Sequence, residues 1–108
     1  MKKYILNTFS SPVAGMEDAY EEWYNNVHLA DLLKIEGIKS AQRFSPIQAP
    51  GANPGKFLAV YEIETDHIAQ FLEEMKNEGQ HMQLSDALDL SSLSTQLYEV
   101  HTEKIVKG

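Results

Sequence analysis

Residues 20–44, YEEWYNNVHLADLLKIEGIKSAQRF, combine a helical pattern, a glycine and a strand pattern. At about 100° per residue, one side of a helix collects the following side chains: Tyr20, Trp23, Tyr24, Val27, Asp31 and Ile35, with His28 and Leu32 at its edge. This spacing predicts a helix from Met16 to about Lys34, and Gly37 is a suitable residue to end it. The next residues, 38–47, alternate between apolar and polar types and predict a strand that Pro46 ends.

Three further segments have the composition or alternation typical of strands, namely residues 3–9, 57–64 and 94–106. The clearest is FLAVYEIE, residues 57–64, in which Phe57, Ala59, Tyr61 and Ile63 share one face. This face is turned either to the helices or away from them, because a change of one residue in register inverts it.

A second helix is predicted from Asp66, as its cap, to about Asn77, and Gly79 would end it. The acidic pairs Glu21-Glu22 and Glu73-Glu74 are expected to face solvent on the two helices. Residues 80–92 have an ambiguous pattern, with a short helical turn as one interpretation. Residues 48–55, QAPGANPG, predict a loop because they are rich in proline and glycine.

The predicted elements follow the order β-α-β-β-α-β in one domain, residues 1–108. Two interleaved right-handed βαβ units in this order give an α+β fold, a four-stranded antiparallel sheet with both helices on one face. The first strand carries large apolar side chains on both faces, with Tyr4 and Leu6 opposite Ile5 and Phe9. We therefore expect a second copy of the chain to cover the face that the helices leave open, in a two-fold homodimer.

The composition restricts the available chemistry. Because the chain has no cysteine, it cannot form disulfides, thiolate zinc sites, iron–sulfur clusters or thiol nucleophiles. A formal net charge of −7 argues against nucleic acid and anionic membrane as partners and favours an uncharged ligand. The sequence has no membrane-spanning apolar run, no secretory signal and no phosphate-binding glycine loop, so we expect a cytoplasmic protein without a nucleotide cofactor.

Three residues of the first helix could carry chemistry. Tyr24, His28 and Asp31 share one side of the helix because they are four and three residues apart. In an acid–base relay, Asp31 would orient His28 and raise its basicity, and His28 or Tyr24 would exchange a proton with a ligand. Whether or not this relay forms, Asp31 needs a partner, because it lies near the centre of the helix side that faces the core. Arg43 from the second strand is the expected partner.

Two other interpretations of these residues stay open. Aromatic side chains at helical spacing usually build a core, and a histidine paired with an aspartate often only satisfies buried polar groups. A metal site formed by His28, Glu99 and His101 is conceivable, because these residue types bind zinc or iron.

Residues 20–44 resemble the signature of the dimeric α+β-barrel superfamily, most closely its ethyl tert-butyl ether degradation (EthD)-like branch and related uncharacterised small domains. The signature is a W-Y-x-x-x-H-hydrophobic-x-D helix, a glycine turn and a strand that ends in arginine and an aromatic residue. The residues that match it are Trp23, Tyr24, His28, Leu29, Asp31, Gly37, Ala41, Arg43 and Phe44. Ala30 stands where the signature commonly has proline.

This resemblance implies a ferredoxin-like subunit, a barrel-like homodimer and a ligand cavity between the first helix and the sheet. The superfamily includes polyketide cyclases, monooxygenases without metal or flavin, isomerases, haem enzymes and proteins with no known activity. For this chain it implies a small-molecule enzyme that acts on an aromatic or polyketide-like ligand by cofactor-free proton transfer. The reaction would be of the cyclase, isomerase, lyase or monooxygenase type.

Under this hypothesis the catalytic residues are His28, Tyr24, Asp31 and Arg43, with His28 as the general base or acid. Tyr20, Trp23 and Tyr61 would bind the ligand, and neither a metal nor an organic cofactor is expected. Two alternatives remain. One is a non-catalytic protein that binds a hydrophobic ligand or assists a partner enzyme, and the other is a haem protein with His28 or His81 as the iron ligand.

Overall fold

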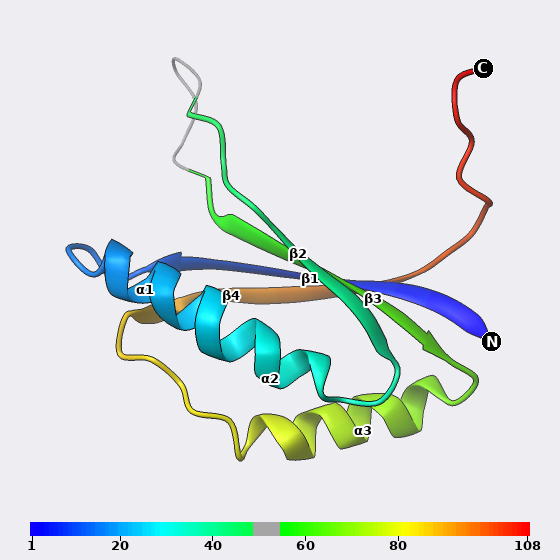
Figure 1. The fold of residues 1–108 in the computed structure, drawn as a ribbon, viewed down its shortest axis with the longest axis horizontal. Helices are drawn as coiled ribbons and strands as arrows, with labels where there is room; N and C mark the ends of the chain where they lie inside the picture. The colour runs from blue at the N-terminus through cyan, green and yellow to red at the C-terminus, as the bar shows by residue number, and fades with distance from the viewer. Residues whose placement is uncertain (49–54) are drawn as a thin grey trace.

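The structure, a computed structural model, describes residues 1–48 and 55–108 and contains one sheet with its helices on a single side (Figure 1). The strands are β1 (Lys2–Pro12), β2 (Ile38–Phe44), β3 (Phe57–Thr65) and β4 (Leu88–Glu99). Their order in the sheet is β2-β3-β1-β4, and all neighbouring strands are antiparallel. The predicted α+β fold class and sheet are therefore confirmed. The loop predicted at residues 48–55 lies almost wholly outside the described residues.

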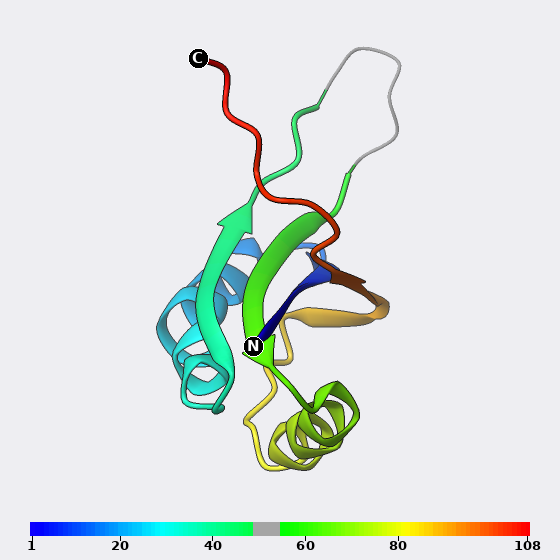
Figure 2. The same ribbon diagram turned by 90° about the vertical axis from the view of Figure 1, so that its right-hand side faces the viewer.

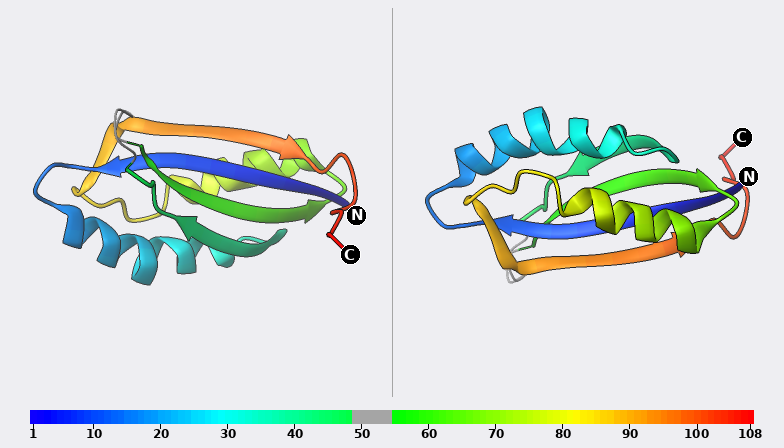
Figure 3. Two further views of the ribbon diagram at one scale, coloured as in Figure 1. Left: turned by 90° about the horizontal axis from the view of Figure 1, so that it is seen from above. Right: turned by 90° about the horizontal axis from the view of Figure 1, so that it is seen from below.

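The first predicted helix consists of three consecutive parts, α1 (Glu17–Trp23), a π-helical turn η1 (Tyr24–His28) and α2 (Leu29–Leu33). The second is α3 (Ile68–Gly79). Figures 2 and 3 show that the first helix lies along the β2 side of the sheet, whereas α3 crosses under other strands. None of the described helices is long and apolar enough to cross a membrane.

Gly37 makes the turn between α2 and β2, and two constraints favour glycine at this position. Its φ of +101° lies in the left-handed region, which side chains with a Cβ rarely adopt. A Cβ built there would lie 3.0 Å from the ring of Phe71 on α3. The turn therefore brings the two helices together at this end of the sheet.

The core lies between the helices and the sheet, and the face of Tyr61 belongs to it. From β1 and β3, alternate residues are buried there, namely Tyr4, Leu6, Ala59, Tyr61 and Ile63. The helices contribute Tyr20, Trp23, Tyr24, Leu32 and Phe71, and the turn after α2 contributes Ile35. Tyr61 is only 1% exposed, so its strand is in the register that turns this side chain toward the helices.

Both ends of the predicted last strand and the predicted cap of the second helix are wrong. β4 begins at Leu88 rather than at residue 94 and ends at Glu99, because the pairing of β1 with β4 shifts between Phe9 and Ser11 and disrupts the alternation. Asp66 does not cap α3, which begins after His67 without a side-chain cap. Its carboxylate instead accepts a hydrogen bond from the backbone N–H of Lys2 at 3.3 Å.

Candidate functional site

The π-helical turn changes which side chains of the first helix meet. In η1 the backbone N–H of Leu29 bonds to the carbonyl of Tyr24, five residues earlier, rather than four as in an α-helix. Correspondingly, His28 lies beside Trp23, also five residues away. Their rings are stacked, with centroids 4.6 Å apart and an angle of 22° between planes. A regular helical wheel places His28 only at the edge of the buried side.

Tyr24 is at the centre of a buried aromatic cluster, which we define as Tyr20, Trp23, Tyr24, His28 and Tyr61. Its ring centroid lies 5.5 Å from that of Tyr20, 5.3 Å from Trp23 and 5.1 Å from His28. Tyr20 and Tyr24 are 0% and 3% exposed. The rings thus fill the space between helix and sheet where the resemblance implied a ligand cavity.

Two polar atoms of the cluster are buried without a hydrogen-bond partner among the described residues, the Nδ1 of His28 and the hydroxyl of Tyr61. Two other polar atoms of the cluster have partners. The Tyr20 hydroxyl is 2.6 Å from Ser10 Oγ, and Trp23 Nε1 donates to the Gln83 carbonyl at 2.9 Å. An unsatisfied buried polar atom costs about 1–3 kcal/mol, so the two free atoms are suited to bond a ligand.

Burial sets the protonation states of the cluster. It lowers the pKa of His28 below its ordinary value, and the negative charge of Asp31 opposes this only in part. Burial also raises the pKa of Tyr24, and it raises that of Tyr61, where the adjacent Tyr24 adds to the effect. At neutral pH His28 is therefore a neutral imidazole, and Tyr24 and Tyr61 are protonated phenols.

Arg43 lies against this cluster, but its partner is Glu21. The guanidinium forms two hydrogen bonds with the Glu21 carboxylate and donates to Asn25 Oδ1 at 2.8 Å. It also lies 4.4 Å from the centroid of the Tyr24 ring. Burial would lower the pKa of Arg43, but the Glu21 carboxylate raises it above its ordinary value.

The predicted pair of Asp31 and Arg43 is wrong. Glu21, for which the sequence predicts a solvent-facing position, is partly exposed and also binds Arg43. The first helix and β2 run in opposite directions, so Arg43 near the end of β2 lies beside the start of the helix. Asp31, near the end of the helix, is instead 3.6 Å from Lys34 Nζ. No hydrogen bond joins Asp31 to His28 in the described part of the chain, so the relay is not formed as a bonded chain.

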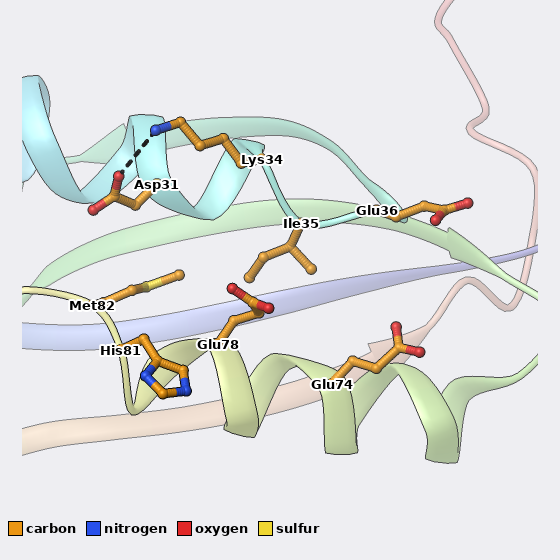
Figure 4. Close-up of a pocket in the computed structure, with 8 residues that line it drawn as sticks. All are labelled: Asp31, Lys34, Ile35, Glu36, Glu74, Glu78, His81 and Met82. Carbon is orange, nitrogen blue, oxygen red and sulfur yellow. Dashed lines mark ion pairs between the residues drawn. The ribbon is translucent and has the colours of Figure 1, made fainter.

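A hollow of about 430 Å³ lies between α2 and α3 and begins one helical turn beyond His28 (Figure 4). We call it the helix-side hollow, and it is lined by Asp31, Lys34, Ile35, Glu36, Glu74, Glu78, His81 and Met82. Four of its side chains are carboxylates and one is a lysine, so the hollow disfavours anionic ligands.

The residues of the conceivable metal site, His28, Glu99 and His101, do not form a metal-binding group in the described structure. Among residues 1–48 and 55–108 no group of three or more histidine, aspartate or glutamate side chains is arranged to hold a metal ion. His101 lies beyond the end of β4, so it does not share a strand face with Glu99.

No protein-family model and no curated protein sequence matches this chain. Solved structures match nearly all of it. One is an EthD family protein from Bacillus halodurans C-125, with a TM-score of 0.66, 18% identity, and coverage of 94% of this chain and 100% of that chain. Another is a mutant of MhuD with two manganese protoporphyrin IX molecules per active site, with a TM-score of 0.66, 16% identity and coverage of 97% and 99%.

A third is a mutant of SnoaB, a cofactor-independent oxygenase from Streptomyces nogalater, with a TM-score of 0.55, 8% identity and coverage of 99% and 98%. This chain has the ferredoxin-like fold of the dimeric α+β-barrel proteins. The resemblance of residues 20–44 to that superfamily is confirmed at the level of the fold.

A haem ligated by His28 or His81 stays an alternative from the sequence. In the described conformation the His28 ring is stacked on Trp23 and its Nδ1 is buried, so either an iron or a substrate could reach that nitrogen only after the rings rearrange. His81 lines the helix-side hollow, where Glu74 and Glu78 would repel the haem propionates.

Proposed function

We propose that the chain is a small-molecule enzyme that transfers a proton on a neutral aromatic or polyketide-like ligand without a cofactor. The reaction type is that of a cyclase, isomerase, lyase or monooxygenase. The observation that supports this most is the pair of buried atoms without partners, His28 Nδ1 and the Tyr61 hydroxyl, in two residues that both neighbour the catalytic candidate Tyr24.

In this proposal His28 is the general base. Because its pKa is lowered, its imidazole is neutral at pH 7 and can take a proton from a C–H or O–H group of the ligand. The phenols of Tyr24 and Tyr61 remain protonated and donate hydrogen bonds to the ligand oxygen on which negative charge develops. In an isomerase or cyclase His28 then returns the proton to another ligand atom, and in a lyase it protonates the leaving group, so the proton balance closes. A monooxygenase would also consume dioxygen, which oxidises the deprotonated ligand and leaves its second oxygen atom as water.

Arg43 and Asp31 have indirect roles here. Burial raises the pKa of Tyr24, and the positive charge of Arg43 lowers it. Arg43 therefore favours negative charge at Tyr24. The negative charge of Asp31 acts through space, without a bond to His28, and partly offsets the lowering of the His28 pKa by burial. Tyr20 and Trp23 would hold the aromatic part of the ligand by stacking.

The charge of the site supports a neutral ligand. The helix-side hollow next to His28 is acidic, and the only cation at the cluster, Arg43, is already compensated by Glu21 in the described structure. An anionic ligand would have to displace the Glu21 carboxylate from Arg43. A neutral ligand needs only a rearrangement of the rings that fill the cluster.

The filled cluster also favours a second candidate function, a non-catalytic protein that binds a hydrophobic ligand. Tyr20, Tyr24 and Tyr61 are at most 3% exposed, so the described conformation has no room for a substrate among them. A protein that only stores or senses a ligand would open in the same way but would form no product.

We further propose that the chain forms a homodimer through the open face of the sheet. Phe44 and Tyr98 are 43% and 50% exposed on this face, and Ile5, Leu58 and Val60 accompany them. A contiguous apolar face of this kind is rarely left in contact with water. A cytoplasmic location stays a prediction from the sequence.

The test uses 2-tetralone, a neutral aromatic ketone whose C1 protons exchange with deuterium after deprotonation. Binding is followed by the emission of Trp23, the single tryptophan of the chain, and exchange by NMR. We expect the protein to accelerate exchange, and His28→Ala to reduce the acceleration by about 100-fold or more. His67→Ala, which changes an exposed histidine at the start of α3, is the matched control and should have no effect.

The outcomes separate the two candidates. Binding without any acceleration of exchange would identify a binding protein, and the absence of both would exclude this ligand class. Unchanged exchange in His28→Ala would remove His28 from the catalytic role.

A further inference from the structure

Arg43 is the only arginine of the chain, and it lies against the aromatic cluster with its side chain only 12% exposed. Three aromatic rings lie beside its guanidinium. The Cζ atom is 4.4 Å from the ring centroid of Tyr24, 5.3 Å from that of Phe57 and 5.5 Å from that of Tyr20. The proposed site therefore contains a fixed positive charge that has little access to water.

A guanidinium in such a place is suited to bind a carboxylate. Its planar set of N–H donors matches the two oxygens of a carboxylate, and the two groups can form parallel hydrogen bonds. A charge that is largely buried also needs an opposite charge beside it, because water no longer stabilises it. An aromatic acid would meet both requirements, with its carboxylate on Arg43 and its ring against those of Tyr20 and Tyr24.

The carboxylate that Arg43 binds in this structure belongs to the protein itself. Both oxygens of the Glu21 carboxylate accept hydrogen bonds from the guanidinium, one from Nη1 and the other from Nη2 at 3.2 Å. Asn25, four residues further along the helix, accepts a bond from Nη1 at 2.8 Å. Glu21 is the more exposed member of the ion pair, at 39% against 12% for Arg43. Glu21 therefore occupies donors that the carboxylate of a ligand would need.

We propose that Glu21 is a specificity-determining residue of the site, because its carboxylate occupies Arg43 and thereby excludes aromatic acids while neutral aromatic ketones can still bind. An acid that displaces Glu21 gains hydrogen bonds to Arg43, but it leaves two carboxylates close together, and like charges repel. A ketone leaves the ion pair intact. This inference rests on the ligand site proposed above and names the class of compound that the site rejects.

The first test compares two ligands of nearly the same shape, 2-acetylnaphthalene and 2-naphthoate. They differ in a methyl group of the ketone where the acid has a charged oxygen. Equilibrium dialysis, followed by ultraviolet absorbance, measures the dissociation constant of each ligand for the full chain. We expect the wild type to bind the ketone at least tenfold more tightly than the acid. Equal dissociation constants, or tighter binding of the acid, would overturn the role of Glu21.

The second test removes the charge of Glu21 and keeps its shape. Glu21→Gln should bind 2-naphthoate at least tenfold more tightly than the wild type, because Arg43 then lacks its anion. The dissociation constant of the ketone should change by less than about twofold. If this variant does not fold, the comparison of the two ligands in the wild type still tests the proposal.

Glu22→Gln is the matched control for this substitution. Glu22 is the next residue of the same helix and is exposed, and its replacement changes the net charge of −7 by the same single unit. It should leave both dissociation constants unchanged. An equal gain of 2-naphthoate affinity in the two variants would reveal a long-range effect of charge and overturn the proposal, as would no gain in Glu21→Gln.

A double variant tests whether the gained affinity depends on Arg43. In Glu21→Gln/Arg43→Gln both members of the ion pair are neutral, so the gain for 2-naphthoate should disappear. A gain that persists without Arg43 would place the acid elsewhere and make the proposal wrong.

These outcomes are separate from those of the deuterium-exchange assay. If the protein shows the expected preferences but accelerates no exchange, the proposed enzyme fails and the role of Glu21 stands. If exchange is accelerated but Glu21→Gln gains no affinity for the acid, the role of Glu21 fails and the enzyme stands. Binding of neither ligand by the wild type or any variant would overturn both.

Discussion

The two helices cover the same face of the sheet but differ in what they bury. α3 is an uninterrupted α-helix that buries Phe71, with Ile68 and Met75 packed at the edge of the core. The first helix contains the π-helical turn η1 and buries Tyr20 and three further aromatic or aliphatic side chains, Trp23, Tyr24 and Leu32. One helix supplies apolar area, while the other also buries groups that form hydrogen bonds.

This difference distinguishes the residues of α3, which stabilise the fold, from the candidate functional residues of the first helix. An amphipathic α-helix such as α3 agrees with every rule of stable folding, and its burial is explained by stability alone. Three features in and beside the first helix reduce stability. They are the π-helical turn, the unpartnered Nδ1 of His28 and the unpartnered hydroxyl of the neighbouring Tyr61. Departures of this kind concentrate where a protein uses its residues for chemistry.

The largest expected effect tests the α3 half of the comparison. Phe71→Ala removes a ring that is 3% exposed and leaves a cavity, so the free energy of unfolding should fall by about 3–5 kcal/mol. Urea denaturation measures it. The emission of Trp23 in the native state should not change, because Phe71 stabilises the fold without shaping the aromatic cluster. A loss below about 1 kcal/mol or a shifted emission would contradict this separation.

A smaller effect tests the first helix and its surroundings. Tyr20→Phe removes a hydroxyl that is bonded to Ser10 Oγ, so the free energy of unfolding should fall by about 1 kcal/mol. Tyr61→Phe removes a buried hydroxyl without a partner, so stability should stay the same or rise. Each variant is the control for the other, since both delete one oxygen from a buried ring.

In the exchange assay the order should reverse, with Tyr61→Phe losing more acceleration than Tyr20→Phe. Equal losses of stability in the two variants would show that Tyr61 has a partner in solution and would weaken its assignment to the site.

Much of the fold could be predicted because it depends on local patterns. The alternation of Phe57, Ala59, Tyr61 and Ile63 reflects the period of a strand, and Gly37 reflects a backbone conformation that other residues avoid. The order of the elements then restricts the topology to few choices. The start of β4 was missed because its irregular pairing with β1 interrupts the alternation.

The candidate site was predicted only in part, because its contacts depend on long-range geometry. The pattern identified Tyr24 and His28, but a wheel of constant angle cannot represent the π-helical turn that stacks His28 on Trp23. The partner of Arg43 could not be found on the helix alone, since it depends on where β2 lies against it. Because the first helix and β2 run in opposite directions, a residue near the end of β2 lies beside the start of the helix. This rule favours Glu21 over Asp31 as the partner of Arg43.

The smallest expected effect concerns the pH dependence of His28. In the folded chain its pKa is lowered below the ordinary value of 6.5, whereas the unfolded chain keeps about that value. As the pH falls below 6.5, the unfolded state binds the proton first, so the free energy of unfolding decreases until the folded pKa is passed. Above pH 6.5 the contribution is fully present. His28→Gln should remove this part of the pH dependence, and His67→Ala should keep it.

Trp23 reports the same titration directly in the folded state. Because the His28 ring is stacked on the single tryptophan, protonation of the imidazole places a charge against the indole and should quench its emission. The midpoint of this quenching should lie below pH 6.5, since burial opposes the charged form. A midpoint at or above 6.5 would mean that His28 is exposed or paired with Asp31. The first helix would then bury no unpaired imidazole, and its contrast with α3 would rest on the phenols alone.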